Sequence, residues 1–366
     1  MRIALPLLAA VLASMPSGGR AATFCVSDAE ELRAALQTAG GNGANDVIRI
    51  KTGTYPTTQF LLNIAFTYST AQDFDIRLEG GWAGTGDTCS RRFSSPTATV
   101  LTGSGVGPVL RMTGADGSAG DMVVERLTIR DGKSGQYGAG LRIGGNAGPG
   151  GFAGDIVIER VYFDNNESDE WAAGLALETA GGARVRDSIF RSNACVVNGC
   201  AAELFMSHAD AVDFRAVFAN NTVFGNQCLP GGDACSTGGL LVNSPFDLEP
   251  RTLLLNNVFA LNDGNDIQFL SDHVKLRYNS FNQSWGVPAA AFGNMNVINP
   301  GFVSYLDEDF RLRPDSPMRN AGYDGLLFGL PPYSAADFAG QTRVQESRID
   351  IGAHEFSERI FADGFD

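Results

Sequence analysis

Short apolar segments recur along the middle of the chain, from Gly138 to Phe281, and they are of two alternating kinds. The first kind follows small residues, and its segments begin at Leu141, Leu175, Leu204, Leu240 and Ile267. The second kind ends on a large apolar residue, often beside asparagine, at Ile129, Phe163, Phe190, Phe224, Phe259 and Phe281. Neighbours in each series are separated by roughly 22–36 residues, and the two series keep step.

This pattern predicts a solenoid of strands. The segments alternate in polarity over a few residues and are rich in Val, Ile and Phe, which is typical of strands and unlike the period of a helix. Two series in step indicate coils of constant strand content with turns of variable length. Equivalent strands of successive coils are then parallel and stack about 4.8 Å apart. An antiparallel sandwich of the same strands is the alternative.

Asparagine recurs at the expected turns. It tolerates left-handed backbone geometry, and its side-chain amide can stack on the same residue of the next coil. The residues concerned are Asn165, Asn166, Asn193, Asn220, Asn221, Asn226, Asn256, Asn257 and Asn279.

One helix is predicted, near the N-terminus. Ser27 or Asp28 can cap it, and Glu30 and Glu31 lie in its first turn. Its apolar face consists of Leu32, Ala35, Leu36 and Ala39. Such a helix would cover the first coil, whose core and strand edges would otherwise be open to solvent.

Composition and charge narrow the class of protein. The chain of 366 residues carries a net charge of −14, which disfavours binding to nucleic acid or to an anionic membrane surface. Arg2, an apolar run over 3–15 and small residues before Ala22 predict a signal peptide at 1–21. No other apolar run approaches the ~20 residues of a membrane-spanning helix.

The six cysteines form an even set, as expected of a disulfide-bonded exported protein. The economical pairing joins sequence neighbours, which gives Cys195–Cys200, Cys228–Cys235 and Cys25–Cys89. Fifteen pairings are possible in principle. A metal site is the rival interpretation, but no histidine stands at a metal-ligand spacing from these cysteines, so no metal ligand is assigned.

Other residues resemble a known family. They are Glu31-Leu-Arg-Ala-Ala-Leu36, Gly53-Thr-Tyr55, Ile298-Asn-Pro-Gly-Phe302, Asp309-Phe-Arg-Leu312, Asn320-Ala-Gly322, Asp337-Phe-Ala-Gly340 and Ile349-Asp-Ile-Gly352-Ala-His-Glu-Phe356. With the repeat, they resemble right-handed parallel β-helix proteins of the pectin-lyase-like fold, and within these the group with a choice-of-anchor Q domain.

The resemblance implies an all-β fold: a single-stranded right-handed parallel β-helix with an N-terminal helical cap and a C-terminal cap of strands and loops. It implies a β-helix over 22–297, a choice-of-anchor Q-like region over 298–356 and a tail at 357–366. The tail is similar to a terminal sorting motif of exported proteins in some Gram-negative bacteria. We therefore expect a secreted or outer-membrane-associated protein.

Because this fold hosts polysaccharide lyases and hydrolases, the strands after the small residues are the place to look for chemistry. Alternation turns Arg142, Glu178 and Glu203 outward on neighbouring strands. A glycoside hydrolase needs two carboxylates about 5–9.5 Å apart, which Glu178 and Glu203 could supply. Solvated glutamates on a sheet face are the alternative interpretation. The three residues would support catalysis only if they converge in one groove that the 144–155 loop leaves open.

Aromatic and polar side chains on the same face, Phe205, Trp171 and Gln268, are candidates for contact with a glycan. Acidic turns around Asp263, Asp307 and Asp164 could bind Ca²⁺, although none has the spacing of a dedicated calcium loop; no other cofactor is expected. We expect a non-catalytic exported protein that contacts glycans or cell surfaces through its lateral face. The alternative is a polysaccharide lyase or glycoside hydrolase.

Overall fold

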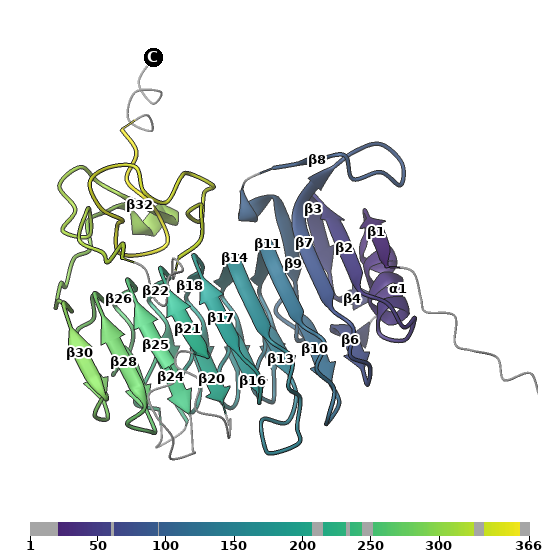
Figure 1. Ribbon diagram of the computed structural model, residues 1–366, viewed down its shortest axis with the longest axis horizontal. Helices are drawn as coiled ribbons and strands as arrows, with labels where there is room; N and C mark the ends of the chain where they lie inside the picture. Colours follow the sequence, from purple (N-terminus) through teal and green to yellow (C-terminus); the bar gives the residue numbers. More distant parts are fainter. Residues whose placement is uncertain are drawn as a thin grey trace, which may run out of the picture.

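The computed structural model describes residues 21–59, 62–93, 95–206, 215–231, 235–243, 252–325 and 333–358. Most of the predicted signal peptide, the tail beyond residue 358 and His208 lie outside these ranges. Figure 1 shows a stack of strands that rises coil by coil from the N-terminal helix, with a compact block of loops beside the later coils.

The stack is a parallel β-helix, as the sequence predicts, and the antiparallel alternative is excluded because strands of successive coils pair in parallel. The largest sheet has the order β1 (Ala22–Val26), β2 (Asp46–Lys51), β7 (Ile76–Ala83), β11 (Met122–Arg130), β14 (Ile156–Asp164), β17 (Ala183–Arg186), β21 (Ala216–Ala219), β25 (Thr252–Leu255), β28 (Val274–Arg277) and β30 (Ala290–Phe292). Its branches are β3 (Gly53–Pro56), β8 (Arg91–Arg92), β9 (Thr99–Thr102), β18 (Ile189–Arg191), β22 (Thr222–Phe224) and β26 (Val258–Ala260).

The second sheet forms the opposite wall and contains the strands that follow small residues. Its order is β6 (Phe66–Thr70), β10 (Leu110–Gly114), β13 (Leu141–Gly144), β16 (Leu175–Thr179), β20 (Ala202–Met206), β24 (Leu240–Asn243), β27 (Ile267–Phe269) and β29 (Ser284–Trp285). Short strands at one corner form a third sheet: β12 (Lys133–Ser134), β15 (Glu167–Ser168), β19 (Ala194–Cys195) and β23 (Gln227–Cys228). The remaining pairs are β4 (Thr58–Gln59) with β5 (Leu62–Asn63), and β31 (Phe302–Ser304) with β32 (Asp309–Leu312).

Two ladders of buried asparagine fix the corners of the coils. In the first, Asn193 donates its side-chain amide to Asn226 Oδ1 at 2.9 Å and to the Phe163 carbonyl at 3.1 Å. Asn166 and Asn226 repeat this arrangement in the neighbouring coils, and Asn262 ends the ladder by donating to the Val223 carbonyl and to Asp266 Oδ1. The second ladder is Asn221, Asn257, Asn279 and Asn294. The predicted stacking of amides is confirmed.

The residue before each ladder asparagine adopts a left-handed conformation. Asn165 has φ 52°, Asn220 has φ 53° and Asn256 has φ 55°. This geometry turns the chain by one sharp corner and leaves the side chain of the left-handed residue outside the coil. Asparagine accepts it at little cost because its short polar side chain bonds locally.

Helix α1 (Ala29–Ala39) begins where the sequence predicts. Asp28 is the N-cap, and its side chain accepts from the backbone N–H groups of Glu30 and Glu31. The predicted apolar face, from Leu32 to Ala39, is buried on the first coils. Figure 1 shows the helix across the N-terminal end of the stack.

The C-terminal block, residues 298–325 and 333–358, packs on the side of the later coils rather than across the end of the stack (Figure 1). It binds the left-handed corner residues: Asn256 donates to the Tyr323 carbonyl at 3.0 Å and accepts from Tyr323 N at 2.8 Å. Fully buried Arg343 ion-pairs with Asp187 of one corner and with Glu355 of the block. Burial raises the pKa of Asp187 to about 6 and that of Glu355 to about 8, although Arg343 opposes both shifts.

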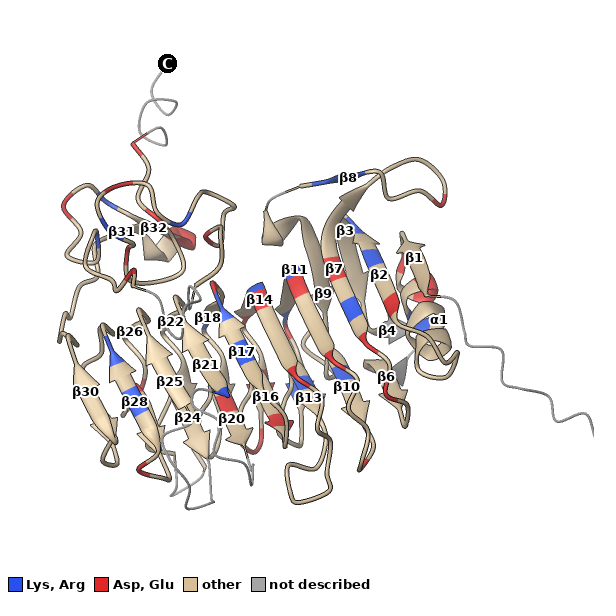
Figure 2. Ribbon diagram, viewed as in Figure 1, with Lys and Arg blue, Asp and Glu red and all other residues tan. Residues whose placement is uncertain are grey.

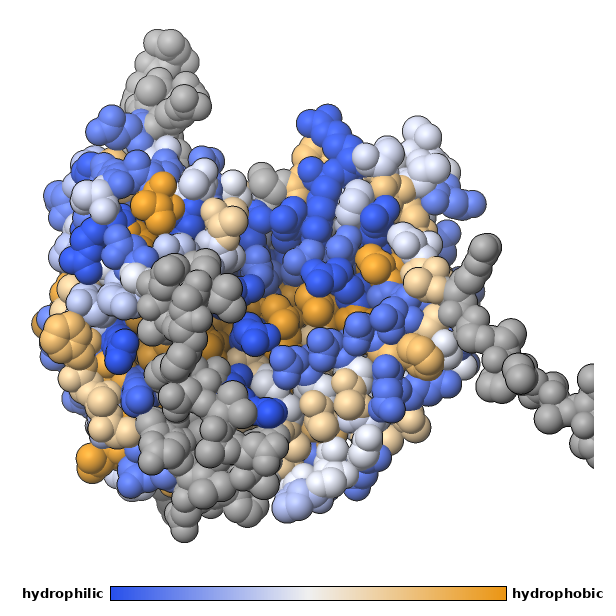
Figure 3. Space-filling view, in the orientation of Figure 1, coloured by the Kyte–Doolittle hydropathy of each residue, from blue (hydrophilic) through white to orange (hydrophobic). Residues whose placement is uncertain are grey.

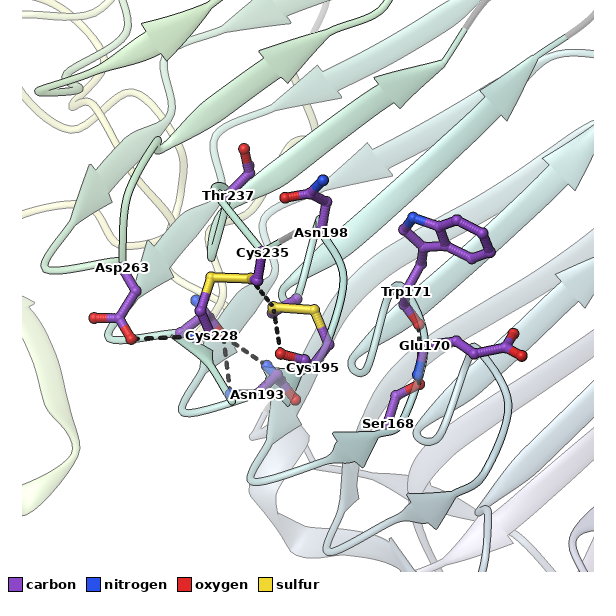
Figure 4. Close-up of a disulfide and its surroundings, with 12 residues drawn as sticks. Ser168, Glu170, Trp171, Asn193, Cys195, Asn198, Cys228, Cys235, Thr237 and Asp263 are labelled. Carbon is purple, nitrogen blue, oxygen red and sulfur yellow. Dashed lines mark hydrogen bonds between the residues drawn. A yellow bond between two sulfur atoms is a disulfide. The ribbon is translucent and has the colours of Figure 1, made fainter. Parts of the chain in front are cut away.

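The disulfides have the predicted pairing: Cys25–Cys89, Cys195–Cys200 and Cys228–Cys235. The two local bridges lie in adjacent coils, where Cys195 pairs with Cys228 across β19 and β23. Figure 4 shows them packed against each other, with the sulfurs of Cys200 and Cys235 3.8 Å apart. The third bridge ties β1 to the long β7–β8 excursion.

The asparagine ladder predicts a large cost for one substitution. Asn193→Ala leaves buried partners such as the Phe163 carbonyl unsatisfied, so the free energy of unfolding should fall by about 2–3 kcal/mol. Urea denaturation followed by circular dichroism measures it. Exposed Asn296→Ala is the control and should change the value by less than about 0.5 kcal/mol. Equal effects would contradict the ladder's role.

The lengths of the loops that the disulfides close predict which bridge contributes more to stability. Replacing Cys25 and Cys89 by serine removes a closure of 64 residues, whereas replacing Cys195 and Cys200 removes one of 5. The loop-entropy model gives losses of about 4 and about 2 kcal/mol, respectively. The thermal midpoints of the two double variants should therefore differ in that order. The reverse order would show that strain or contacts, and not loop length, decide the contribution of each bridge.

Candidate functional site

A groove of about 610 Å³ lies on the outer face of the second sheet, over β13, β16, β20 and β24. Its volume is in the range of small-molecule and sugar sites. Arg142, Glu178 and Glu203, the three predicted catalytic candidates, all line it. The other lining residues that carry the argument below are Tyr137, Trp171, Phe205 and Asn243.

The strand register explains why these side chains meet. Outward positions form two columns across the strands, because parallel pairing sets equivalent residues side by side. One column contains Arg111, Arg142, Ala176, Glu203 and Leu241. The other contains Thr113, Gly144, Glu178, Phe205 and Asn243. Glu178 and Glu203 are thus diagonal neighbours, with Cα atoms roughly 8 Å apart from the strand spacing and rise.

Two small residues hollow out the groove. Ala176 stands between Arg142 and Glu203 in the first column, and Gly144 stands beside Glu178 in the second. Gly144 has φ 110°, and a Cβ there would lie 1.8 Å from the Glu178 carbonyl oxygen. Only glycine fits this close approach. The floor therefore dips beside the two glutamates.

The 144–155 loop leaves the groove open. Gly145 and Asn146 form part of one wall. Phe152, the largest side chain of the loop, turns inward, is fully buried and packs over Gly114 and Gly145. The loop thus bounds the groove without filling it.

Arg142, which lines the groove, and its neighbour Arg111 on β10 have no acidic ion-pair partner among the described residues. Arg111 and Arg142 are side by side on β10 and β13, and neither takes part in an ion pair there. The Arg142 guanidinium lies 4.2 Å from the centre of the Tyr137 ring and donates to its hydroxyl. Burial, and then repulsion from Arg142, lower the pKa of Arg111. Two cationic side chains therefore stand on adjacent strands, one of them in the groove lining.

The carboxyl group of Glu203 has a strongly raised pKa. Its pKa is raised to about 7: burial raises the pKa most, a hydrogen bond with the Asn243 side chain lowers it, and the nearby charge of Glu178 adds a smaller increase. A carboxyl group with a pKa near 7 can deliver a proton at neutral pH. The groove therefore combines a proton donor with a second carboxylate.

The candidates for glycan contact are not all in the groove. Trp171 and Phe205 line it, and Trp171 is exposed, so both can offer an aromatic surface to a sugar ring. Gln268 is buried, and its Oε1 accepts from the Thr237 hydroxyl at 2.8 Å. It is used inside the protein and does not belong to the groove lining.

The acidic turns considered for Ca²⁺ bind protein groups. Asp266 accepts from Asn262 and from the backbone of Asn282, and Asp309 pairs with Arg311. Asp164 pairs with Arg130 and Arg191. Within the described ranges, one group of potential ligand atoms lies close enough to hold a metal: Cys195, Cys200 and Cys235. All three are in disulfides, which accounts for their proximity.

Two lining residues and one neighbour of the groove were not assigned these roles from the sequence: Tyr137 as the partner of Arg142, Asn243 as the partner of Glu203, and Arg111 beside Arg142. Arg111 and Asn243 sit at the outward positions of strands that pair with the candidates, so the register could have found them. Tyr137 lies in a turn, and periodicity gives no information on where a turn residue points.

Comparisons with known proteins do not assign a function to the groove. No family model matches the sequence. No curated protein matches it either. The solved structures similar to it include the pectate lyase Pel9A, with 13% sequence identity and a TM-score of 0.35, over 93% of this chain and 97% of that chain. At this distance the site has to be argued from the residues of this chain. Among the described residues, no helix has the length and apolar character needed to span a membrane.

The raised pKa of Glu203 predicts a pH-dependent stability. The folded protein holds a proton on Glu203 up to about pH 7, whereas the unfolded chain releases it near pH 4.3. Stability should therefore fall as pH rises from about 4.5 to 7.5. Glu203→Gln should remove this contribution, which thermal midpoints measured at each pH would reveal. Glu167→Gln, in a solvent-exposed ion pair outside the groove, is the control. Parallel curves for wild type and Glu203→Gln would contradict the shift.

Proposed function

We propose that the groove binds a glycan and hydrolyses a glycosidic bond in it, with Glu203 and Glu178 as the carboxylate pair. The observation that carries this proposal is the meeting of the two glutamates in one open groove, where burial keeps Glu203 protonated near neutral pH. Their positions on adjacent strands suit the separation that glycoside hydrolysis requires.

Each residue has a role in this mechanism. Protonated Glu203 donates to the leaving glycosidic oxygen as the bond from the anomeric carbon breaks. The Glu178 carboxylate stabilises the positive charge that develops on the sugar, and it acts as nucleophile or as base toward the attacking water. Asn243 is a positioning residue, because its side chain holds the Glu203 carboxyl group.

The rest of the groove suits a sugar chain. Trp171 and Phe205 provide apolar surfaces for the faces of sugar rings. Arg142, without an acidic ion-pair partner among the described residues, provides donors for hydroxyl or carboxylate oxygens of the substrate. Proton abstraction from a uronic acid, as in a lyase, is the second candidate, and the observation that favours it is Arg142, which lines the groove without an ion-pair partner among the described residues. A purely binding role would use the same aromatic and cationic groups without turnover.

Export and family membership are part of the proposal. The apolar N-terminal run and the cysteine pairing support a secreted or outer-membrane-associated protein of a Gram-negative bacterium. The residues quoted above for 298–356 support assignment of that region to the choice-of-anchor Q group. In the structure this region packs on the coils as one block, which agrees with a unit of its own along the chain.

The test is incubation of the mature protein with a panel of neutral and acidic polysaccharides. We expect new reducing ends, with kcat falling on the alkaline side of about pH 7 as Glu203 loses its proton. Glu203→Gln should lower kcat by about 10²–10⁴-fold and remove the alkaline limb. Glu178→Gln should lower kcat at all pH values.

The control is again Glu167→Gln, which should retain full activity. Products with a new double bond, which absorb in the ultraviolet, would show that the protein is a lyase and not a hydrolase. A third outcome is that the protein binds a glycan but forms no product. If that binding is lost in Trp171→Ala and unaffected by Glu203→Gln, the groove has a binding role and hydrolysis is excluded. No binding and no products across the panel would sink the proposal.

A further inference from the structure

The last coil of the β-helix differs from the others in charge. From Tyr278 to Leu306 the sequence has no Asp, Glu, Lys or Arg, whereas the whole chain carries −14. Figure 2 shows the contrast on the largest sheet: charged residues mark β2, β7, β11 and β14, and β30 at the opposite end has none. The stack therefore ends in an uncharged surface.

Two strands at this end have an unpaired edge. β30 is the last strand of the largest sheet and β29 the last of the second, so each has a hydrogen-bonded neighbour on one side only within the described chain. Ala291 pairs with buried Leu276 and occupies an inward position, yet it is exposed. The inward position of the last coil is therefore exposed, while the core of the preceding coil at Leu276 stays buried.

Large apolar side chains surround the open end. Their exposed fractions are 54% for Trp285, 76% for Val287 and 66% for Phe292. Figure 3 shows apolar residues along the margin where Figure 1 places β30. The described part of the C-terminal block binds the corners at Asn220 and Asn256 and packs on Met295 and Val297, and it leaves these side chains exposed. Soluble proteins usually protect such edges with charges or a covering element.

We propose that a second copy of this chain covers the open end, so that two β-helices associate last coil to last coil. Two strongly acidic proteins repel each other over most of their surfaces, and the uncharged end is where they can approach without this cost. Pairing of two identical surfaces gives a closed two-fold dimer.

The other end of the stack explains why the assembly stops at two copies. Helix α1 covers the first coil there, and Asp28, Glu30 and Glu31 add negative charge. A head-to-tail contact, which would continue into a fibre, would bring the apolar end against this charged helix. In the described part of the chain, one end of the stack is therefore left uncovered in each copy.

The experiment is analytical ultracentrifugation of the mature protein over a range of concentrations and salt. We expect a monomer–dimer equilibrium that tightens as salt screens the repulsion between the acidic bodies. Phe292→Lys and Val287→Lys should each weaken dimerisation at least tenfold, with circular dichroism and thermal unfolding of the monomer unchanged. Val106→Lys, at an exposed apolar residue in a turn of an early coil, is the matched control and should dimerise as wild type does.

Several results would overturn the proposal. They are a monomer at all concentrations and salt levels, a dimer that both lysine variants leave intact, or growth beyond the dimer. Equal loss of the dimer in Val106→Lys would also count against it, because a charge far from the proposed interface would then have the same effect. The groove assays described above use a different face of the protein, so failure of the proposed function would leave this result unaffected.

Discussion

The stacking of side-chain amides at the corners is the constraint on which the rest of this structure depends. A buried asparagine satisfies three demands at once: it accepts from its neighbour's backbone and side-chain N–H groups and donates to a carbonyl of the adjacent coil. Any coil that slipped by one residue would leave several buried polar groups without partners, each at a cost of about 1–3 kcal/mol. The ladders therefore hold every strand in register with the next.

The fixed strand register decides which outward residues of the sequence become neighbours on the surface. Because outward residues of successive strands align in columns, a few small residues such as Ala176 and Gly144 are enough to hollow one face. The charged residues that flank the hollow are then brought together although they are far apart along the chain. The glutamates interact through low-dielectric surroundings, which is why burial and mutual repulsion act on the same carboxyl group.

The same corners serve a second purpose on the opposite side of the coils. Their left-handed residues point outward, and the C-terminal block uses them as binding points, through Asn220, Asn256 and the buried ion pairs of Arg343. These contacts hold the C-terminal block on the side of the solenoid. The surface at the end of the stack is therefore formed by the residues of the last coil itself.

Much of the fold could be predicted from the sequence. The two series of apolar segments, the cap at Asp28, the stacked asparagines and the disulfide pairing all rest on local chemistry or on a repeat, and all are confirmed. Of the site, alternation alone placed Arg142, Glu178 and Glu203 on the outer face of their strands.

Other features depended on the tertiary structure, because they depend on distances across coils and on where turns fold. The convergence of the three candidates required the strand register, and the open groove required Phe152 to turn inward. The burial of Gln268, the approach of Tyr137 to Arg142 and the docking of the C-terminal block to the side involve turns and loops whose paths no periodicity encodes. The sequence by itself determined which residues each strand turns outward; only the tertiary structure decided which of them share a site, because that depends on how the variable turns stack the coils.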